Sequence, residues 1–89
     1  MKFEWDDKKA AANLKKHGIS FESAAGAFED ELSATFPDPD HAKSEARLIT
    51  YGMALDGKLL VISHTKQGDT IRIISARLAT NHERKRYEI

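Results

Sequence analysis

Apolar residues in the first third of the chain alternate briefly and then follow helical spacing. Residues 3–5 alternate apolar and polar side chains, which predicts a short strand. Asp6 is suited to cap a helix over residues 8–16, and Gly18 suits the left-handed turn that ends such a helix. Ser20 predicts the start of a second helix. The apolar face of this second helix consists of Phe21, Ala24, Ala25 and Phe28.

From residue 32 onward the pattern changes to strands separated by turns. Residues 32–36 predict a strand that ends at Pro37. Asp56-Gly57 and Gln67-Gly68 are turn signals between β-prone runs. The strands around these turns are predicted at residues 47–55, 58–66 and 69–78.

The chain closes with a helix that begins at Thr80, because Thr80 and Glu83 have the spacing of a capping box. The predicted order of elements is therefore β-α-α-β-β-β-β-α. This order is typical of an α+β fold, in which helices pack on one face of a small antiparallel sheet. At this length we expect residues 1–89 to form a single domain.

The faces of the sheet depend on the lengths of the turns. With two-residue loops, residue 51 lies opposite 62, and residue 62 lies opposite 73. The other face is more polar and is expected to meet solvent, with Arg72 standing on it. Arg77 joins that open face only if a bulge follows Ile74, and a one-residue slip in either turn exchanges the faces. The predicted core face comprises Ile49, Tyr51, Met53, Leu60, Ile62, Ile71 and Ile73.

Aromatic residues other than the tyrosines are interpreted as core anchors rather than base-stacking platforms. Tyr51 fits either the core or its rim, and Tyr87 either docks the last helix or contributes a hydroxyl to a site. The predicted anchors are Trp5, Phe21, Phe28 and Phe36.

The net charge of zero hides an uneven distribution. Residues 1–45 hold six Lys/Arg against ten Asp/Glu, a net charge of −4, whereas residues 46–89 hold eight against four, a net charge of +4. Either the two halves pair with each other, or the basic half meets an anionic partner such as phosphate. Arginine within a β-prone run is costly unless it reaches water, a carboxylate or a phosphate, so Arg72 and Arg77 indicate a site for an anion.

Other classes of chemistry are disfavoured. The chain has no cysteine, no histidine pair with metal-ligand spacing and no nucleotide-binding or zinc-protease motif, so we expect no cofactor and no metal. No apolar run is long enough to cross a bilayer and no signal segment is present, which predicts a cytoplasmic protein without membrane contact.

Candidate site residues cluster around the predicted strands. Glu45 and Arg47 either form a surface ion pair or act as a base and a phosphate clamp. His64 is either a buried, hydrogen-bonded histidine or a proton-transfer group. The run Arg84-Lys85-Arg86 is either a solvated face or an extension of the basic site.

One ordered set of residues runs along nearly the whole chain: residues 3–6, Asn13, residues 16–18, Phe21, Ala24, residues 28–30, Asp40, His41, Glu45, Arg47, Gly52, residues 71–77, Glu83, Arg84 and Tyr87. With this set the chain resembles the BrnT family of toxins from type II toxin–antitoxin systems. The resemblance implies a compact RelE-like fold and a ribonuclease that inhibits translation. It also implies neutralisation by a ribbon-helix-helix antitoxin, with operator DNA bound only by the toxin–antitoxin complex. Members often have an arginine where this chain has Gln67, which implies weaker activity or a substitute role for Lys66.

These residues fit RNA cleavage by the substrate's own 2′-hydroxyl, without a metal. We expect Arg72 and Arg77, with Arg47, to hold the scissile phosphate. The sequence does not assign the base or the acid to a single residue. The base candidates are Glu45 and His64, and the acid candidates are Tyr87 and His41. Further RNA contacts are expected from Lys66, Arg84, Arg86 and His41.

Three alternative functions remain open at this stage. The first is a non-catalytic module that binds RNA or a partner, with the steep salt dependence of phosphate contacts. The second is an inactive toxin remnant. The third, a sequence-specific DNA-binding domain, is the least favoured, because the chain has no helix-turn-helix pattern.

Overall fold

The computed structural model describes residues 1–39 and 46–87. Five strands form one sheet in the order β1-β5-β4-β3-β2. Neighbouring strands are antiparallel, except that β1 runs parallel to β5. The predicted order of elements and the α+β class are confirmed. The elements are β1 (Lys2–Glu4), α1 (Asp7–His17), α2 (Phe21–Ala27), β2 (Ala34–Pro37), β3 (Leu48–Met53), β4 (Leu59–Gln67), β5 (Thr70–Leu78) and α3 (Asn81–Tyr87).

Local hydrogen bonds explain where α1 and α2 begin and end. The Asp6 carboxylate accepts from the backbone amides of Lys8 and Lys9, which satisfies two of the free donors at the start of α1. Gly18 ends α1 in the left-handed conformation at a φ of 72°, as predicted. The Ser20 hydroxyl accepts from the backbone amide of Ser23 and caps α2.

Asn13 attaches α1 to the edge of β5. Its side-chain amide donates to the carbonyl of Ala76 at 2.8 Å, and its oxygen accepts from the Ala76 amide at 3.1 Å. It also donates to the carbonyl of Ile19 at 3.0 Å. Because β1 pairs only with residues Thr70, Ile71 and Arg72, this asparagine supplies a ladder-like contact farther along the same edge.

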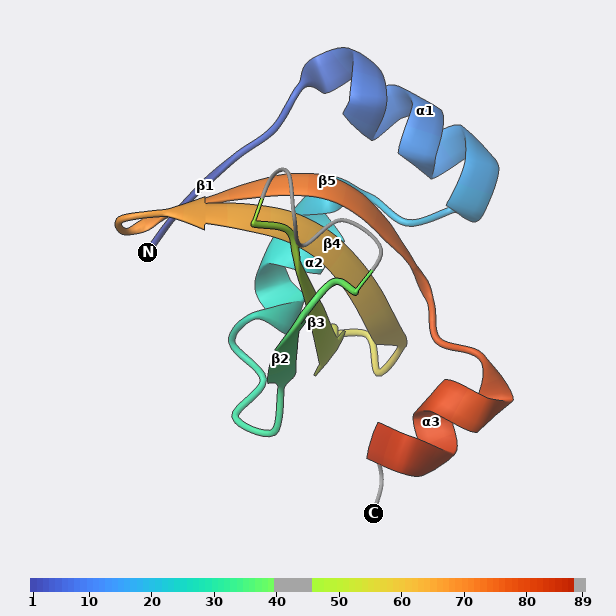
Figure 1. Cartoon of the computed structure of the whole chain (residues 1–89). Helices are drawn as coiled ribbons and strands as arrows, with labels where there is room; N and C mark the ends of the chain where they lie inside the picture. The colour runs from blue at the N-terminus through green and yellow to red at the C-terminus, as the bar shows by residue number, and fades with distance from the viewer. Residues whose placement is uncertain (40–45, 88–89) are drawn as a thin grey trace.

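Helices α1 and α2 cover one face of the sheet, with α2 behind the strands in Figure 1. Gly52 of β3 lies so close to α2 that an added Cβ atom would stand 2.6 Å from the carbonyl oxygen of Ala27. Trp5 and Phe28 pack against this core, as predicted. The buried core consists of Ile19, Phe21, Ala24, Ala27, Ala54, Leu60, Ile62, Ile71, Ile73 and Ala76. In the described part of the chain, no helix combines the length and apolar character of a transmembrane span.

The predicted faces of β3 were wrong, because the first hairpin has a longer loop than predicted. Ala54 pairs with Lys58 across a three-residue loop that ends at Gly57, which has a φ of 87°. Tyr51 therefore lies opposite Val61 rather than residue 62. This one-residue slip turns Thr50 and Gly52 toward α2, and it turns Tyr51 to the opposite face.

A bulge in β5 places Arg77 on the open face. Ser63 pairs with Ser75 and His64 pairs with Ile73, which leaves Ile74 as an extra residue in β5. Without such a bulge Ala76 would lie on the open face, whereas it is buried in the core. Arg72 and Arg77 consequently share the face that α1 and α2 leave uncovered.

Helix α3 departs from the predicted arrangement of helices on one face. Its side chains contact residues of the open face, among them Tyr51 and Arg77. Its predicted capping box is confirmed, because the Glu83 carboxylate accepts from the Thr80 amide at 2.9 Å and the Thr80 hydroxyl accepts from the Glu83 amide at 3.2 Å. The open face is thus a sheet surface bordered by a short helix.

Candidate functional site

Basic side chains gather around a depression at one end of the open face. The depression has a volume of about 480 Å³ and receives cations from four separate segments of the chain. Arg72 comes from β5, Lys66 from β4, Arg47 precedes β3, and Lys9 reaches in from α1. We call this depression the basic groove; it is lined by Lys9, Arg47, Thr65, Lys66, Gln67, Arg72 and Ile74.

The sheet register explains why these residues meet. Arg72 lies directly opposite Thr65 across β4 and β5, and Arg47 precedes Leu48, which pairs with His64, so Arg47, Thr65 and Arg72 fall in one cross-strand row. Lys66, predicted as a further RNA contact, lines the same groove from the exposed end of β4. Gln67 lines the same groove.

Arg72 forms an ion pair with Glu4 of β1. The two charged groups are 3.7 Å apart, and both side chains are about half exposed. An exposed pair of this kind contributes little, typically about 0–1 kcal/mol. A phosphate group therefore has little to displace when it approaches Arg72.

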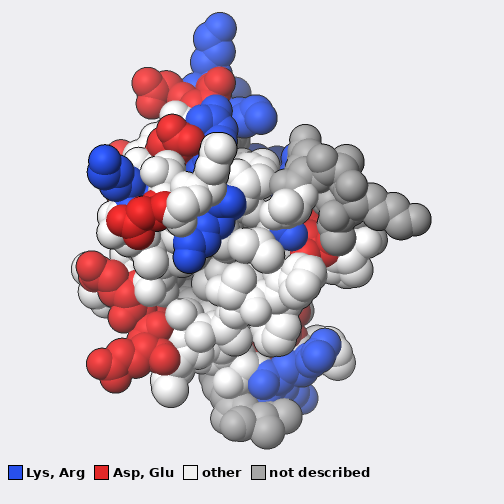
Figure 2. Space-filling view, turned by 60° about the vertical axis from the view of Figure 1, so that its left-hand side comes forward, with Lys and Arg blue, Asp and Glu red and all other residues white. Residues whose placement is uncertain are grey.

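On the face seen in Figure 2, acidic and basic side chains are mixed in the upper left part, and a large uncharged area occupies the centre. The Glu4–Arg72 pair shows that the acidic and basic halves of the chain do contact each other. The basic groove is a local concentration of cations within this mixed surface.

Arg77 belongs to a different cluster, which the sequence analysis did not foresee. Its guanidinium donates to both oxygens of Glu83, at 2.8 and 3.0 Å. These hydrogen bonds raise the pKa of Arg77 and, with the backbone of Thr80, hold the pKa of Glu83 at about 2, although burial opposes that shift. Arg77 therefore anchors α3 and does not line the basic groove.

Tyr87 is held by a second polar contact of α3. Its hydroxyl donates to the carboxylate of Asp30, which also accepts from the backbone amide of Met53 at 2.8 Å. Burial, followed by the hydrogen bond to Asp30, raises the pKa of Tyr87 to about 12. The same hydrogen bond lowers the pKa of Asp30. Tyr87 docks the last helix, which is one of the two roles considered for it.

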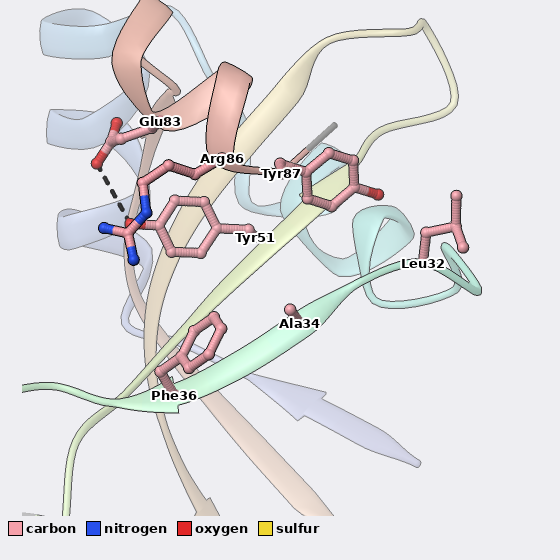
Figure 3. Close-up of a pocket in the computed structure, with 7 residues that line it drawn as sticks. All are labelled: Leu32, Ala34, Phe36, Tyr51, Glu83, Arg86 and Tyr87. Carbon is pink, nitrogen blue, oxygen red and sulfur yellow. Dashed lines mark hydrogen bonds between the residues drawn. The ribbon is translucent and has the colours of Figure 1, made fainter. Parts of the chain in front are cut away.

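A second depression lies between α3 and strands β2 and β3 (Figure 3). It has a volume of about 300 Å³. Phe36, predicted to be a core anchor, is instead 53% exposed on the open face, where it packs edge-on against Tyr51 with ring centroids 6.2 Å apart. We call this depression the aromatic pocket; it is lined by Leu32, Ala34, Phe36, Tyr51, Glu83, Arg86 and Tyr87.

His64 lies in the core, away from both depressions. It is 2% exposed, its Nε2 is 2.7 Å from the Thr50 hydroxyl, and its ring packs edge-on against Phe28. Burial lowers its pKa to about 4. His64 is therefore the buried, hydrogen-bonded histidine of the two alternatives, and its position does not suit contact with RNA.

Two predicted residues, Glu45 and His41, lie outside the described residues. Arg84 and Arg86 are in α3, and Arg86 lines the aromatic pocket. Among residues 1–39 and 46–87, no three His, Asp or Glu side chains come together as ligands for a metal ion.

Sequence reasoning missed Lys9 and Asp30 as participants in these clusters. Lys9 lies in the helix predicted over residues 8–16, and no local signal shows that this helix packs along β5. Asp30 follows α2 closely enough to suggest a turn residue, but its bond to Tyr87 joins positions 57 residues apart.

Comparison with known proteins agrees with this geometry. The family model described as "Ribonuclease toxin, BrnT, of type II toxin-antitoxin system" matches residues 5–83. The 1.1 Å crystal structure of the Brucella abortus ribonuclease toxin BrnT is similar to this fold, with a TM-score of 0.71 and 25% sequence identity. The match covers 91% of this chain and 99% of the Brucella chain. No curated protein sequence is significantly similar. Because the family model spans most of the sequence, this chain belongs to the BrnT family of ribonuclease toxins of type II toxin–antitoxin systems.

Proposed function

We propose that this toxin is a cytoplasmic, metal-independent endoribonuclease that stops translation by cutting RNA, and that the basic groove holds the phosphodiester to be cut. The observation that carries the proposal is the meeting of Lys9, Arg47, Lys66 and Arg72 around one depression. Guanidinium groups match the geometry of phosphate oxygens and remain charged at neutral pH, and lysine adds a compact positive charge.

The proposed reaction uses the RNA as its own nucleophile. The 2′-oxygen attacks the adjacent phosphorus while a base removes its proton. The bond to the 5′-oxygen then breaks as an acid protonates that oxygen, leaving a 2′,3′-cyclic phosphate and a 5′-hydroxyl. Arg47, Lys66 and Arg72 stabilise the extra negative charge on the phosphorane. A metal is not required, since the nucleophile belongs to the substrate and the side chains neutralise the charge.

Two of the four candidates for proton transfer are held in other contacts. His64 is buried on the other side of the sheet, and the Tyr87 hydroxyl donates to Asp30. We therefore propose Glu45 as base and His41 as acid, two residues that lie outside the described residues but precede Arg47 closely in the sequence. Glu45→Gln and His41→Ala should each slow cleavage by roughly 100-fold, whereas a tyrosine or histidine role elsewhere would leave these rates unchanged.

Cleavage of a labelled RNA by the purified protein tests this function. We expect RNA to be cut at the same rate with and without EDTA. Arg72→Ala and Lys66→Ala should each lower the rate at least tenfold. Lys58→Ala is the matched control, because Lys58 lies in the first hairpin and pairs with Asp56 at 3.8 Å, outside the groove. RNA that is bound but remains intact would instead support a non-catalytic binding module.

We further propose that a ribbon-helix-helix antitoxin neutralises this toxin and that only the complex binds operator DNA. Family membership supports an antitoxin partner. The charge of the basic groove supports inhibition by carboxylates that compete with phosphate for the same cations. Induced expression of the toxin should arrest growth, and co-expression of the adjacent gene should relieve the arrest. A neighbouring gene that encodes no ribbon-helix-helix protein would contradict the partner proposal.

A further inference from the structure

The aromatic pocket has the features of a site for one planar ring. Figure 3 shows the rings of Phe36, Tyr51 and Tyr87 around it, with the small side chain of Ala34 between them. Its volume of about 300 Å³ lies at the low end of the range for ligand sites, roughly 300–1,000 Å³. A single base fits this size better than a folded segment of a partner protein.

Arg86 is the polar group of the pocket that is available to a ligand. It extends from α3 toward the hydroxyl of Tyr51 (Figure 3), and it forms no hydrogen bond or ion pair within the described part of the chain. Glu83, by contrast, already accepts four hydrogen bonds, two from Arg77, one from Thr80 and one from Tyr51. The pocket therefore offers a ligand the hydrogen-bond donors of the Arg86 guanidinium. The Glu83 carboxylate is already engaged by hydrogen bonds within the protein.

We propose that the aromatic pocket binds a guanine base of the RNA, with Arg86 donating to the O6 and N7 acceptors of that base. This inference rests on the proposed function, since it takes RNA as the ligand. Arginine pairs with these two adjacent acceptors of guanine, whereas adenine presents a donor, its N6 amino group, in place of O6. Aromatic side chains that stack on unpaired bases are the common means of reading single-stranded RNA.

The position of the pocket relative to the basic groove supports one RNA strand reaching both. A cross-strand row runs from Ala34 through Tyr51 and Val61 to Arg77, on the face that also bears Arg72. Arg72 and Arg77 are five residues apart in β5, which is roughly 16 Å at about 3.3 Å per residue. A few nucleotides of single-stranded RNA cover such a distance, with the backbone in the cationic groove and a base on the aromatic rings.

Binding of non-cleavable RNA tests the pocket separately from the nuclease activity. Short 2′-O-methyl oligonucleotides with a single guanine, inosine, 7-deazaguanine or adenine would be compared by fluorescence anisotropy. We expect inosine to bind within about twofold of guanine, since it retains O6 and N7. Adenine should bind at least roughly tenfold more weakly, and 7-deazaguanine roughly fivefold more weakly.

Variants assign the preference to the pocket. Arg86→Ala should reduce the preference for guanine over adenine to within about twofold, and Phe36→Ala should weaken binding of all four oligonucleotides roughly fivefold or more. Lys85→Ala is the matched control, since it removes an equal charge from an exposed neighbour in α3 that does not line the pocket. This control should weaken binding slightly and keep the guanine preference.

Several results would overturn the inference. Equal binding of the guanine and adenine oligonucleotides by the unaltered protein would do so, and so would a guanine preference that survives in Arg86→Ala. If both pocket variants bind RNA normally but bind the antitoxin more weakly, the pocket is a protein-docking site instead. Failure of the unaltered protein to cut unmodified RNA would refute the nuclease proposal. The binding assay would still show whether the aromatic pocket prefers guanine, because it uses RNA that cannot be cut.

Discussion

Replacement of Glu83 by glutamine should destabilise the protein in a pH-dependent way. Glutamine keeps the length of the side chain and can still accept from the Thr80 amide, as capping boxes allow. It loses the charge that binds Arg77 through two hydrogen bonds of 2.8 and 3.0 Å. The substitution therefore isolates the ionic contact between α3 and the sheet from the capping of the helix.

The magnitude follows from the pKa of the carboxyl. The pKa of Glu83 falls from an ordinary value of 4.5 to about 2, mainly because of Arg77. At about 1.4 kcal/mol per pKa unit, this difference corresponds to an upper limit of about 3 kcal/mol. The Arg77 side chain is 42% exposed, so solvent screening reduces the expected loss at pH 7 to about 2 kcal/mol.

The sign of the pH dependence is fixed by the lowered pKa. The stabilisation by Glu83 is complete above pH 4.5, the unfolded-state value, and is lost as the pH falls toward 2. Urea unfolding followed by circular dichroism should give a difference between wild type and Glu83→Gln of about 2 kcal/mol at pH 7 and below about 1 kcal/mol at pH 2.

A matched control is Glu31→Gln, which alters an exposed carboxyl in the turn that follows α2. It should change the free energy of unfolding by less than about 0.5 kcal/mol at either pH. A Glu83→Gln difference that is the same at pH 7 and pH 2, or that is no larger than the control, would refute the ionic anchoring of α3.

Three further substitutions test the parts of the fold that position the open face. His64→Leu should lower the free energy of unfolding by about 1–3 kcal/mol, because it leaves the buried Thr50 hydroxyl with one hydrogen-bond partner fewer. RNA cleavage by the folded protein should be unchanged. A loss of cleavage at full stability would restore His64 as a catalytic candidate. Asn13→Ala should cost about 2–4 kcal/mol in urea unfolding, since three buried hydrogen bonds are lost; a cost within about 0.5 kcal/mol would show that water replaces them. Gly52→Ala should lower the melting temperature by several degrees, because its Cβ meets the Ala27 carbonyl oxygen at 2.6 Å; an unchanged melting temperature would mean that α2 shifts freely.

The elements of this fold could be read from the sequence because each has a local signal. Asp6, Ser20 and the Thr80–Glu83 capping box gave the starts of the helices, and hydrogen bonds to neighbouring residues confirm all three. The pairing register could not be read as reliably. Asp56-Gly57 suits both a two-residue loop and the end of a three-residue loop, and this single residue decides which face of β3 meets the helices.

The candidate site was predictable only where the residues share a strand register or a turn. Arg72 and Lys66 lie on neighbouring strands joined by a tight turn, which the sequence predicted, but the predicted pairing of residue 62 with residue 73 was wrong, because His64 pairs with Ile73. The contact of Arg77 with Glu83 could not be predicted in this way. Glu83 matched the capping position of α3, and this role gave no sign that its carboxylate also binds Arg77. Phe36 was assigned to the core for its size alone, although the edge strand β2 leaves it on the open face.

The most direct test of the account compares single-turnover cleavage of one labelled RNA by the unaltered toxin, by Arg72→Ala and by Lys58→Ala, each shown by circular dichroism to be folded. We expect that EDTA does not slow cleavage by the unaltered toxin. Arg72→Ala should cut at least tenfold more slowly, and Lys58→Ala should cut at the unaltered rate. Equal rates for Arg72→Ala and the unaltered toxin would contradict the claim that the basic groove holds the scissile phosphate.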